Sequence, residues 1–365
     1  MKKIFTLISM AFVAMSVNAQ TEESYTAVDA DGNMAAEYAA IVDADGKTAT
    51  NVTNGNSVIK FGTANIEVEG ISTGTPADLQ EGGQDLTIGT SIGENMYEYT
   101  VNSSKPIEWK KGNRGDISYW WIQGTGVPAV SAYAEEVITD GEPTGKYRLA
   151  YVAFDPEVGG LPVTGLYYKI TPKVDGALKI AIWANKGTHP TYVVDGETKQ
   201  VSDYLVEGYI NGQTWKQEDV DAGIVTEDKI GKLKWLDNDA IKALNQQAVD
   251  DLNAKVEKGE TTAEAVAPTF KKLKYTIGYG NQPFWGNLVI DAKANKTYYF
   301  FQGTTQIGFQ GYTFAPGKSK EEMNIESIKN AANNANAPRY NLAGQKVSKD
   351  FKGVVLQNGK KFVQK

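Results

Sequence analysis

The chain has 365 residues, of which 41% are hydrophobic and 22% are charged, and its formal net charge at pH 7 is −7. This composition indicates a folded globular protein with enough material for one large domain or two smaller ones, and it argues against disorder. The chain contains no cysteine and one histidine, His189, which excludes disulfides, thiolate metal sites, histidine zinc sites and serine hydrolase triads.

Residues 1–19 predict a secretory signal peptide. Two lysines precede an apolar run from Ile4 to Val17, and the small residue Ala19 fits cleavage before Gln20. The apolar run is shorter than the about 20 residues that a membrane-spanning helix needs. We therefore expect an exported protein that keeps no transmembrane segment after the signal is removed.

Residues 20–56 contain two near-copies of one short motif, "AVDADGNM" at 27–34 and "IVDADGKT" at 41–48. Each copy places Asp-Gly between short apolar stretches, which is typical of a tight hairpin turn. If the first aspartate is counted as position one, the glycine stands at position four, whereas an EF-hand calcium loop has it at position six. We interpret the region as an N-terminal β-hairpin region, with calcium binding as the alternative.

Residues 57–316 predict a β-sandwich. About ten strand-length runs are separated by Gly, Pro, Asn or Asp, and several alternate between apolar and polar residues. Leu178, Ile180 and Ile182 share one face of such a strand. Many short strands without helices between them favour a mainly β fold, and we expect an antiparallel sandwich of the jelly-roll type.

One stretch of this region, about 217–268, predicts a helical insertion. Apolar residues recur there at helical spacing behind the capping candidates Asp237 and Asn238, and Gly259 ends the run. Thr261 and Glu264 have the spacing of a capping box, and strands are expected to resume at "FKKLKYTIGYG", 270–280. The insertion is interpreted as a packed decoration, with a lid over a site as the alternative.

Residues 317–337 predict a linker helix. Ser319 and Glu322 have capping-box spacing, and the segment then becomes rich in Ala and Asn.

The aromatic residues are the most informative candidates for a binding site. Flat rings stack on the apolar faces of sugar rings, while neighbouring amides, carboxylates and basic groups bind the hydroxyls. Alternation places some of the 7 Trp and 19 Tyr away from the core face of their strands. The candidate carbohydrate platform consists of Trp120, Trp121, Tyr167, Trp183 and Trp285. The alternative is that a two-sheet core buries these rings.

Carboxylate chemistry stays open, because a glycoside hydrolase needs two suitably placed acids and the chain has 44. Sequence spacing selects no particular pair, so no catalytic residue is predicted. No cofactor is expected, and a structural calcium ion in the jelly roll is left open.

Three segments resemble the closing strands of jelly-roll modules in secreted carbohydrate-active proteins. They are "GALKIAIWANKG" at 176–187, "TYVVDGET" at 191–198, and "LVIDAKANKTYYFFQGTTQIGFQGYTF" at 288–314. This resemblance implies the sandwich fold more than it implies a ligand.

The C-terminal tail, 338–365, has seven basic residues and one acidic residue, whereas the rest of the mature chain is strongly acidic, which argues against nucleic-acid binding. Its strand-like runs and Asn358-Gly359 predict a small hairpin unit. The tail resembles the C-terminal sorting domain of secreted Bacteroidota proteins, the type IX secretion tail. The matching positions are Tyr340, Asn341, Leu342, Gly344, Gln345, Val347, Lys352, Gly353 and Lys360, and Gly359 belongs to the hairpin signal. The resemblance implies contact with secretion machinery.

We therefore expect a secreted or cell-surface, non-catalytic protein that binds polysaccharide through aromatic side chains. The alternatives are a structural or adhesive surface protein that contacts other proteins and, third, a carboxylate-dependent glycan-active enzyme. No nucleic-acid partner is expected.

Overall fold

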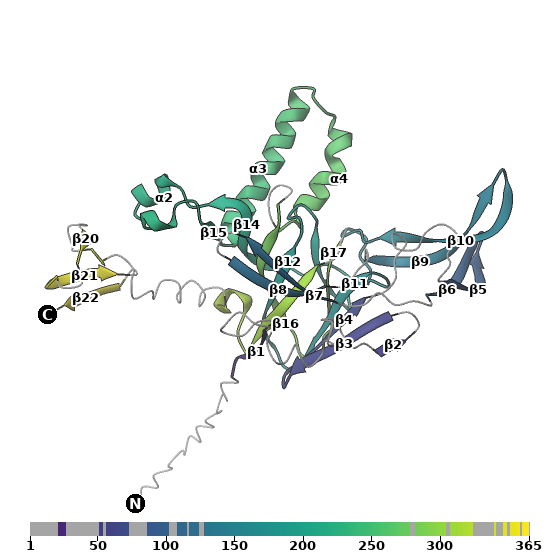
Figure 1. The fold of residues 1–365 in the computed structure, drawn as a ribbon, viewed down its shortest axis with the longest axis horizontal. Helices are drawn as coiled ribbons and strands as arrows, with labels where there is room; N and C mark the ends of the chain where they lie inside the picture. Colours follow the sequence, from purple (N-terminus) through teal and green to yellow (C-terminus); the bar gives the residue numbers. More distant parts are fainter. Residues whose placement is uncertain are drawn as a thin grey trace, which may run out of the picture.

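The computed structural model describes residues 21–26, 51–53, 56–72, 86–101, 108–114, 117–123, 128–277, 282–303, 307–323, 339–340, 346–348, 351–357 and 360–364. Its named strands pair in antiparallel fashion and form four sheets (Figure 1). The strands predominate over the helices, which confirms the mainly β fold class.

The two largest sheets form the body of the protein. The larger one, sheet A, has the strand order β15-β14-β16-β12-β18-β8-β7, and β1 also pairs with β18. The second, sheet D, has the order β13-β17-β11-β4-β3-β2. The strands of sheet A are β1 (Glu23–Thr26), β7 (Glu108–Arg114), β8 (Ile117–Gln123), β12 (Gly176–Ala184), β14 (Leu205–Thr214), β15 (Leu233–Leu236), β16 (Phe284–Ala292) and β18 (Gly308–Pro316). The strands of sheet D are β2 (Asn51–Thr53), β3 (Asn56–Thr63), β4 (Ile66–Ser72), β11 (Leu166–Pro172), β13 (Thr191–Asp195) and β17 (Tyr298–Gln302).

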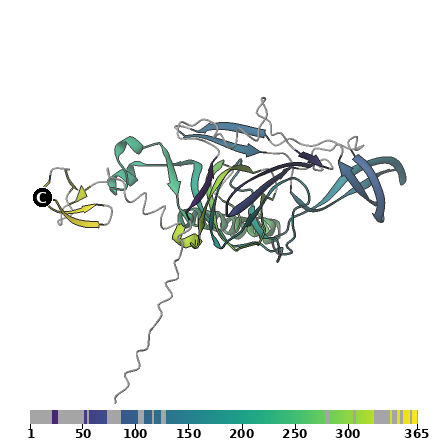
Figure 2. The ribbon, with the colours of Figure 1, turned by 90° about the horizontal axis from the view of Figure 1, so that it is seen from below.

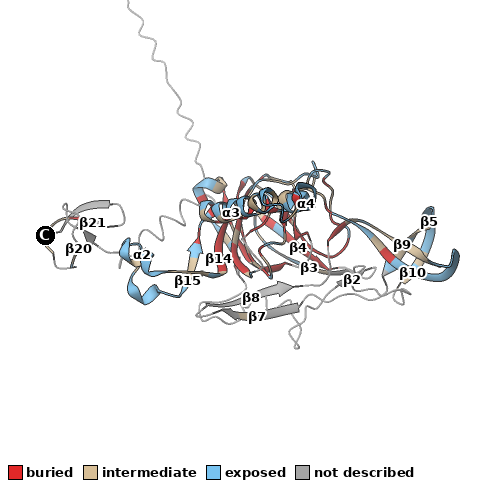
Figure 3. Ribbon diagram, turned by 90° about the horizontal axis from the view of Figure 1, so that it is seen from above, coloured by how far each residue is buried: buried red, intermediate tan, exposed pale blue. Residues whose placement is uncertain are grey.

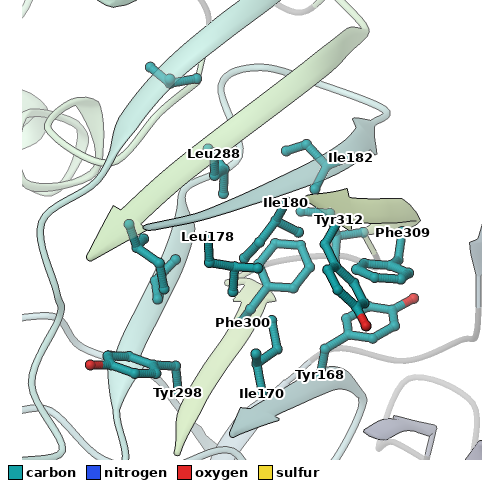
Figure 4. Packing of buried hydrophobic residues seen from close by; sticks show 14 of the residues in the cluster. Tyr168, Ile170, Leu178, Ile180, Ile182, Leu288, Tyr298, Phe300, Phe309 and Tyr312 are labelled. Carbon is teal, nitrogen blue, oxygen red and sulfur yellow. The ribbon is translucent and has the colours of Figure 1, made fainter. Parts of the chain in front are cut away.

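The inner faces of these sheets meet in one apolar core (Figure 4). Leu178, Ile180 and Ile182 of β12 are fully buried, as their alternation predicts. The ring of Tyr168 in sheet D stacks on that of Phe309 in sheet A, with 5.0 Å between the centroids. Figure 3 shows the buried residues gathered between these layers. The β-sandwich is thus confirmed, and its assignment to the jelly-roll type stays a prediction.

A third sheet, which we call the arm, extends from one end of the sandwich (Figures 1 and 2). One face carries the Glu135–Arg148 ion pair, at 2.8 Å. The other carries a small apolar cluster, in which Tyr97 and Tyr147 meet edge to face at 5.3 Å. The strands of the arm are β5 (Leu86–Gly93), β6 (Met96–Val101), β9 (Ala129–Thr139) and β10 (Glu142–Ala153), in the order β10-β9-β6-β5.

Helices occupy the predicted insertion between β14 and β16. They are α2 (Gln217–Asp221), a 3₁₀ turn (Glu227–Lys229), α3 (Asn238–Glu257) and α4 (Ala263–Leu273), and the short strand β15 lies among them. The base of α3 packs on the sandwich, because Ile241 is fully buried in the main core. The far ends of α3 and α4 project from the body as a helical hairpin (Figure 1).

The ends of α3 follow the sequence signals. The Asp237 side chain accepts a hydrogen bond from the Ala240 backbone N–H, and Gly259 follows the last turn with a φ of +72°.

Two predictions about α4 are wrong. Its N-cap is Thr262, one residue after Thr261, and the helix continues to Leu273 where a strand was expected. Pro268 lies inside α4 and does not end it, because Val266 and Leu273 are buried on one side of the helix and stabilise it by packing.

The segment after β18 begins with the predicted capping box. The Ser319 N–H donates to the Glu322 carboxylate at 2.8 Å, and the Glu322 N–H donates to the Ser319 hydroxyl at 3.2 Å. Residues 320–323 are helical, and the rest of the expected linker lies outside the described residues.

The tail forms a sheet of its own. Its strands are β19 (Arg339–Tyr340), β20 (Lys346–Val347), β21 (Gly353–Gln357) and β22 (Lys360–Gln364), in the order β20-β19-β21-β22. Gln357 pairs with Lys360, which fits a two-residue hairpin connection. Tyr340, Val347, Lys352, Gly353 and Lys360 lie in this unit, whereas Asn341, Leu342, Gly344, Gln345 and Gly359 lie outside the described residues.

At the N-terminus, the two Asp-Gly motifs lie outside the described residues. The described strands of this region pair elsewhere: β1 joins β18 of sheet A, and β2 joins β3 of sheet D. The Glu23 carboxylate accepts a hydrogen bond from the Asn65 backbone N–H at 3.0 Å, which ties the first strand to the opposite layer. Within the described segments, no helix has the length and apolar character that crossing a bilayer requires.

Candidate functional site

The structure brings two of the five candidate aromatics together. Trp183 on β12 and Trp285 on β16 are direct cross-strand partners on the outward face of sheet A. Tyr167 lies on the outward face of sheet D, on the other side of the sandwich. Trp120 and Trp121 lie in β8 of sheet A, and their side chains are outside what the structure describes.

Tyr167 does not belong to an open platform. Its side chain is 9% exposed and lies in an apolar cluster with Phe154 and Phe301 on the outside of sheet D. Burial raises the pKa of the Tyr167 phenol to about 12, and the nearby Tyr299 and Glu69 add to the shift. Alternation correctly placed this ring on the face of β11 that points away from the main core, but a second apolar cluster covers that face.

Two further aromatics extend the tryptophan pair toward the edge of sheet A. Tyr209 on β14 is the cross-strand partner of Trp285 and also of Trp235 on β15. The Tyr209 ring meets Trp235 edge to face at 4.9 Å and lies 6.0 Å from Trp285. We call this row of Trp183, Trp285, Tyr209 and Trp235 the aromatic strip.

Exposure varies along the aromatic strip. Trp285 is 4% exposed and supports its neighbours, whereas Trp235 is 39% exposed. Trp183 and Tyr209 are half-buried. A ligand can therefore contact the strip most readily at Trp235, near the sheet edge.

Sequence reasoning missed the exposed end of the strip. Trp235 stands inside the predicted helical insertion, where a four-residue strand gives little periodic signal. Tyr209 follows the alternation of β14, in which Val206 and Ile210 face the core, and that pattern could have identified it.

A polar row lies along one side of the aromatic strip. The Lys179 ammonium is 3.1 Å from the Glu207 carboxylate, and the Asn287 side-chain amide donates to the same carboxylate oxygen at 3.1 Å. These groups come from β12, β14 and β16, and the Glu207 side chain is only 5% exposed. These mutual contacts fix the positions of three polar side chains beside the rings.

Amides lie beyond the other side of the strip. The Asn211 side chain donates to the Gln282 side-chain oxygen at 2.9 Å, and Gln282 is exposed. Since Asn211 follows Tyr209 by two residues, it shares the outward face of β14. The aromatic rings thus have polar groups on both sides.

The strand β15, which carries Trp235, contacts the α2 segment through its neighbouring residue Lys234. The Lys234 ammonium lies 3.1 Å from the Asp219 carboxylate and 4.7 Å from the centre of the Trp215 ring. The pKa of Asp219 is held below its usual value, mainly by a hydrogen bond from the Lys216 backbone N–H and to a smaller extent by the hydrogen bond from the Lys234 ammonium. These contacts fix the segment that borders the exposed end of the strip.

This arrangement supports binding by stacking and hydrogen bonding. Within the described part of the chain, no group of three or more His, Asp or Glu side chains is placed to hold a metal ion. His189 lies on a turn, and its backbone N–H donates to the Lys186 carbonyl at 3.1 Å. Burial, with Lys186 and Lys272 nearby, lowers the pKa of its imidazole.

Comparison with known proteins adds no family to this description. No protein-family model matches the chain, and neither a curated protein nor a solved structure matches it.

Proposed function

We propose that this protein is a secreted, non-catalytic carbohydrate-binding protein whose binding surface is the aromatic strip of sheet A. The observation that carries the proposal is the row of Trp183, Tyr209 and Trp235 with hydrogen-bonding groups on both sides. Such a surface suits a sugar chain, because rings cover its apolar faces while amides and charged groups bind its hydroxyls.

The test is affinity electrophoresis of the mature protein through gels that contain soluble polysaccharides, neutral and acidic. We expect retardation by at least one polysaccharide, and Trp235→Ala should weaken that binding about five- to tenfold. Tyr151→Ala is the matched control, because Tyr151 is 44% exposed but lies on β10 of the arm. Migration unaffected by every glycan, or equal retardation of wild type and Trp235→Ala, would refute the proposal.

A second candidate is a structural or adhesive surface protein that contacts other proteins. The arm favours it, because its strands and turns expose Ile92, Ile138, Tyr151 and Val152 by 44% to 53%. The test is adhesion of beads coated with this protein to a surface that carries other proteins. If no glycan retards the protein, the beads adhere, and Ile138→Ser removes that adhesion, this candidate replaces the first. Turnover of a labelled glycan would instead favour the carboxylate-dependent enzyme.

The signal-like residues 1–19 and the basic tail support an extracellular or outer-surface location as part of the proposal. On this view the tail contacts secretion machinery and determines where the protein accumulates, whereas the sandwich binds the glycan.

A further inference from the structure

A pocket of about 260 Å³ is lined by residues that are all distinct from those of the aromatic strip. Three segments line it: the first turns of α3, the residues after α4, and the connection between β13 and β14. Asn238, Lys242 and Asn245 follow one another along one side of α3. The volume lies just below the range of about 300 to 1,000 Å³ that is typical of drug-sized ligands, so the pocket suits a smaller molecule.

The inner wall of the pocket is held by specific hydrogen bonds. The Tyr204 hydroxyl contacts the carbonyl oxygens of Thr191 at 2.9 Å and of Tyr275 at 3.2 Å. The Val206 N–H donates to the side-chain oxygen of Asn238, which is 7% exposed. Thr276 is 4% exposed and donates its hydroxyl to the Leu273 carbonyl. The wall is therefore preformed.

Asn245 lines this pocket and has an unused hydrogen-bond acceptor. Its side-chain Nδ2 donates to the Thr276 carbonyl at 2.9 Å, which fixes the orientation of the amide. Its Oδ1 is buried and accepts no hydrogen bond from the described residues. A buried carbonyl oxygen without a donor is unfavourable, so a ligand hydroxyl placed there would improve its environment.

The mouth of the pocket carries positive charge, and one of its ammonium groups, that of Lys274, also lies 5.4 Å from the centre of the Tyr275 ring. Lys242 and Lys274 line it and are exposed, and within the described residues neither forms an ion pair. The one carboxylate in the lining, Asp203, is already 2.8 Å from the Lys320 ammonium. The mouth thus favours an anion.

We propose that this pocket binds a small polyhydroxylated carboxylate of about the size of one acidic sugar unit. Its carboxylate contacts the ammonium groups of Lys242 and Lys274, and one of its hydroxyls donates to Asn245 Oδ1. Tyr204 and Tyr275 form the wall beside the ring. This site is separate from the aromatic strip, so it does not depend on the function proposed above.

The experiment is calorimetric titration of the full mature protein with sodium glucuronate at low salt, with glucose and acetate as parallel ligands. We expect a dissociation constant on the order of 1 mM for glucuronate. Glucose lacks the charge and acetate lacks the hydroxyls, so each should bind at least about tenfold more weakly. Undetectable glucuronate binding, or equal binding of acetate or glucose, would overturn the proposal.

Variants locate the site. Lys242→Ala and Lys274→Ala should each weaken glucuronate binding about tenfold, because each removes a charge-assisted hydrogen bond from an exposed position without disturbing the core. Lys255→Ala, at the other end of α3, is the matched control and should keep wild-type affinity. Trp235→Ala should also keep it, which distinguishes this pocket from the aromatic strip. Wild-type affinity in both pocket variants would place the ligand elsewhere and refute the assignment.

Discussion

The ammonium group of Lys179 lies 3.1 Å from the carboxylate of Glu207, and both side chains are largely buried on the outward face of sheet A. Replacement of Glu207 by Ala leaves the Lys179 charge without its partner in a poorly solvated place. We expect the free energy of unfolding to fall by about 3 kcal/mol, measured by urea denaturation. The double variant Lys179→Met/Glu207→Leu should recover most of the loss; a Glu207→Ala protein as stable as wild type would show that the pair is solvated.

Gly286 on β16 lies directly opposite Gly208 on β14. A Cβ on Gly286 would fall 2.5 Å from the Gly208 Cα and closer still to the Glu207 carbonyl, so the strands would have to separate. Gly286→Ala should therefore lower the free energy of unfolding by about 3 kcal/mol, as urea denaturation can measure. Gly93→Ala is the control, because its nearest neighbour would be the flexible Met96 side chain at 3.1 Å. Similar stabilities for the two variants would contradict the close approach.

Replacement by valine should change the stability of the protein in opposite directions at two buried threonines. The Thr191 hydroxyl is buried without a partner among the described residues, whereas the Thr276 hydroxyl donates to the Leu273 carbonyl at 2.9 Å. We expect Thr191→Val to raise the free energy of unfolding by about 1 kcal/mol and Thr276→Val to lower it by a similar amount. Thermal unfolding of both variants under one condition decides the matter, and a loss of stability in Thr191→Val would reveal an unseen partner.

The N-cap of α3 depends on one carboxylate. Asp237→Ala removes the acceptor of the Ala240 N–H and should reduce the free energy of unfolding by about 1 kcal/mol in chemical denaturation. Asp237→Asn keeps a side-chain oxygen at the cap and serves as the control. If Asn and Ala are equally destabilising, then charge near the helix dipole matters more than the hydrogen bond.

Deletion of the tail should leave the sandwich intact. The described strands β19 to β22 pair only with one another, so removing Pro338–Lys365 should change the free energy of unfolding of the body by less than about 0.5 kcal/mol. The location of the protein should change instead, which cell fractionation can follow. A loss of several kcal/mol would show that the tail is a structural part of the sandwich.

Periodicity predicted the layers of the fold better than it predicted the binding surface. The alternation in β12 correctly placed Leu178 in the core and Trp183 outside it, because a period of two depends only on the strand. It could not show that an apolar cluster covers Tyr167, since the residues of that cluster come from distant parts of the chain. It also missed Trp235, whose short strand exists only through pairing with β14.

The route of the chain between the two layers has a consequence for biogenesis. From β11 to β14 each connection crosses from one sheet to the other. The last strand of the sandwich, β18, joins β12 on one side to β1 and β8 on the other. Neither half of sheet A is therefore complete until residue 316 is available. A nascent chain that lacks this segment presents unpaired edges, so the sandwich can close only after the chain up to residue 316 has been synthesised.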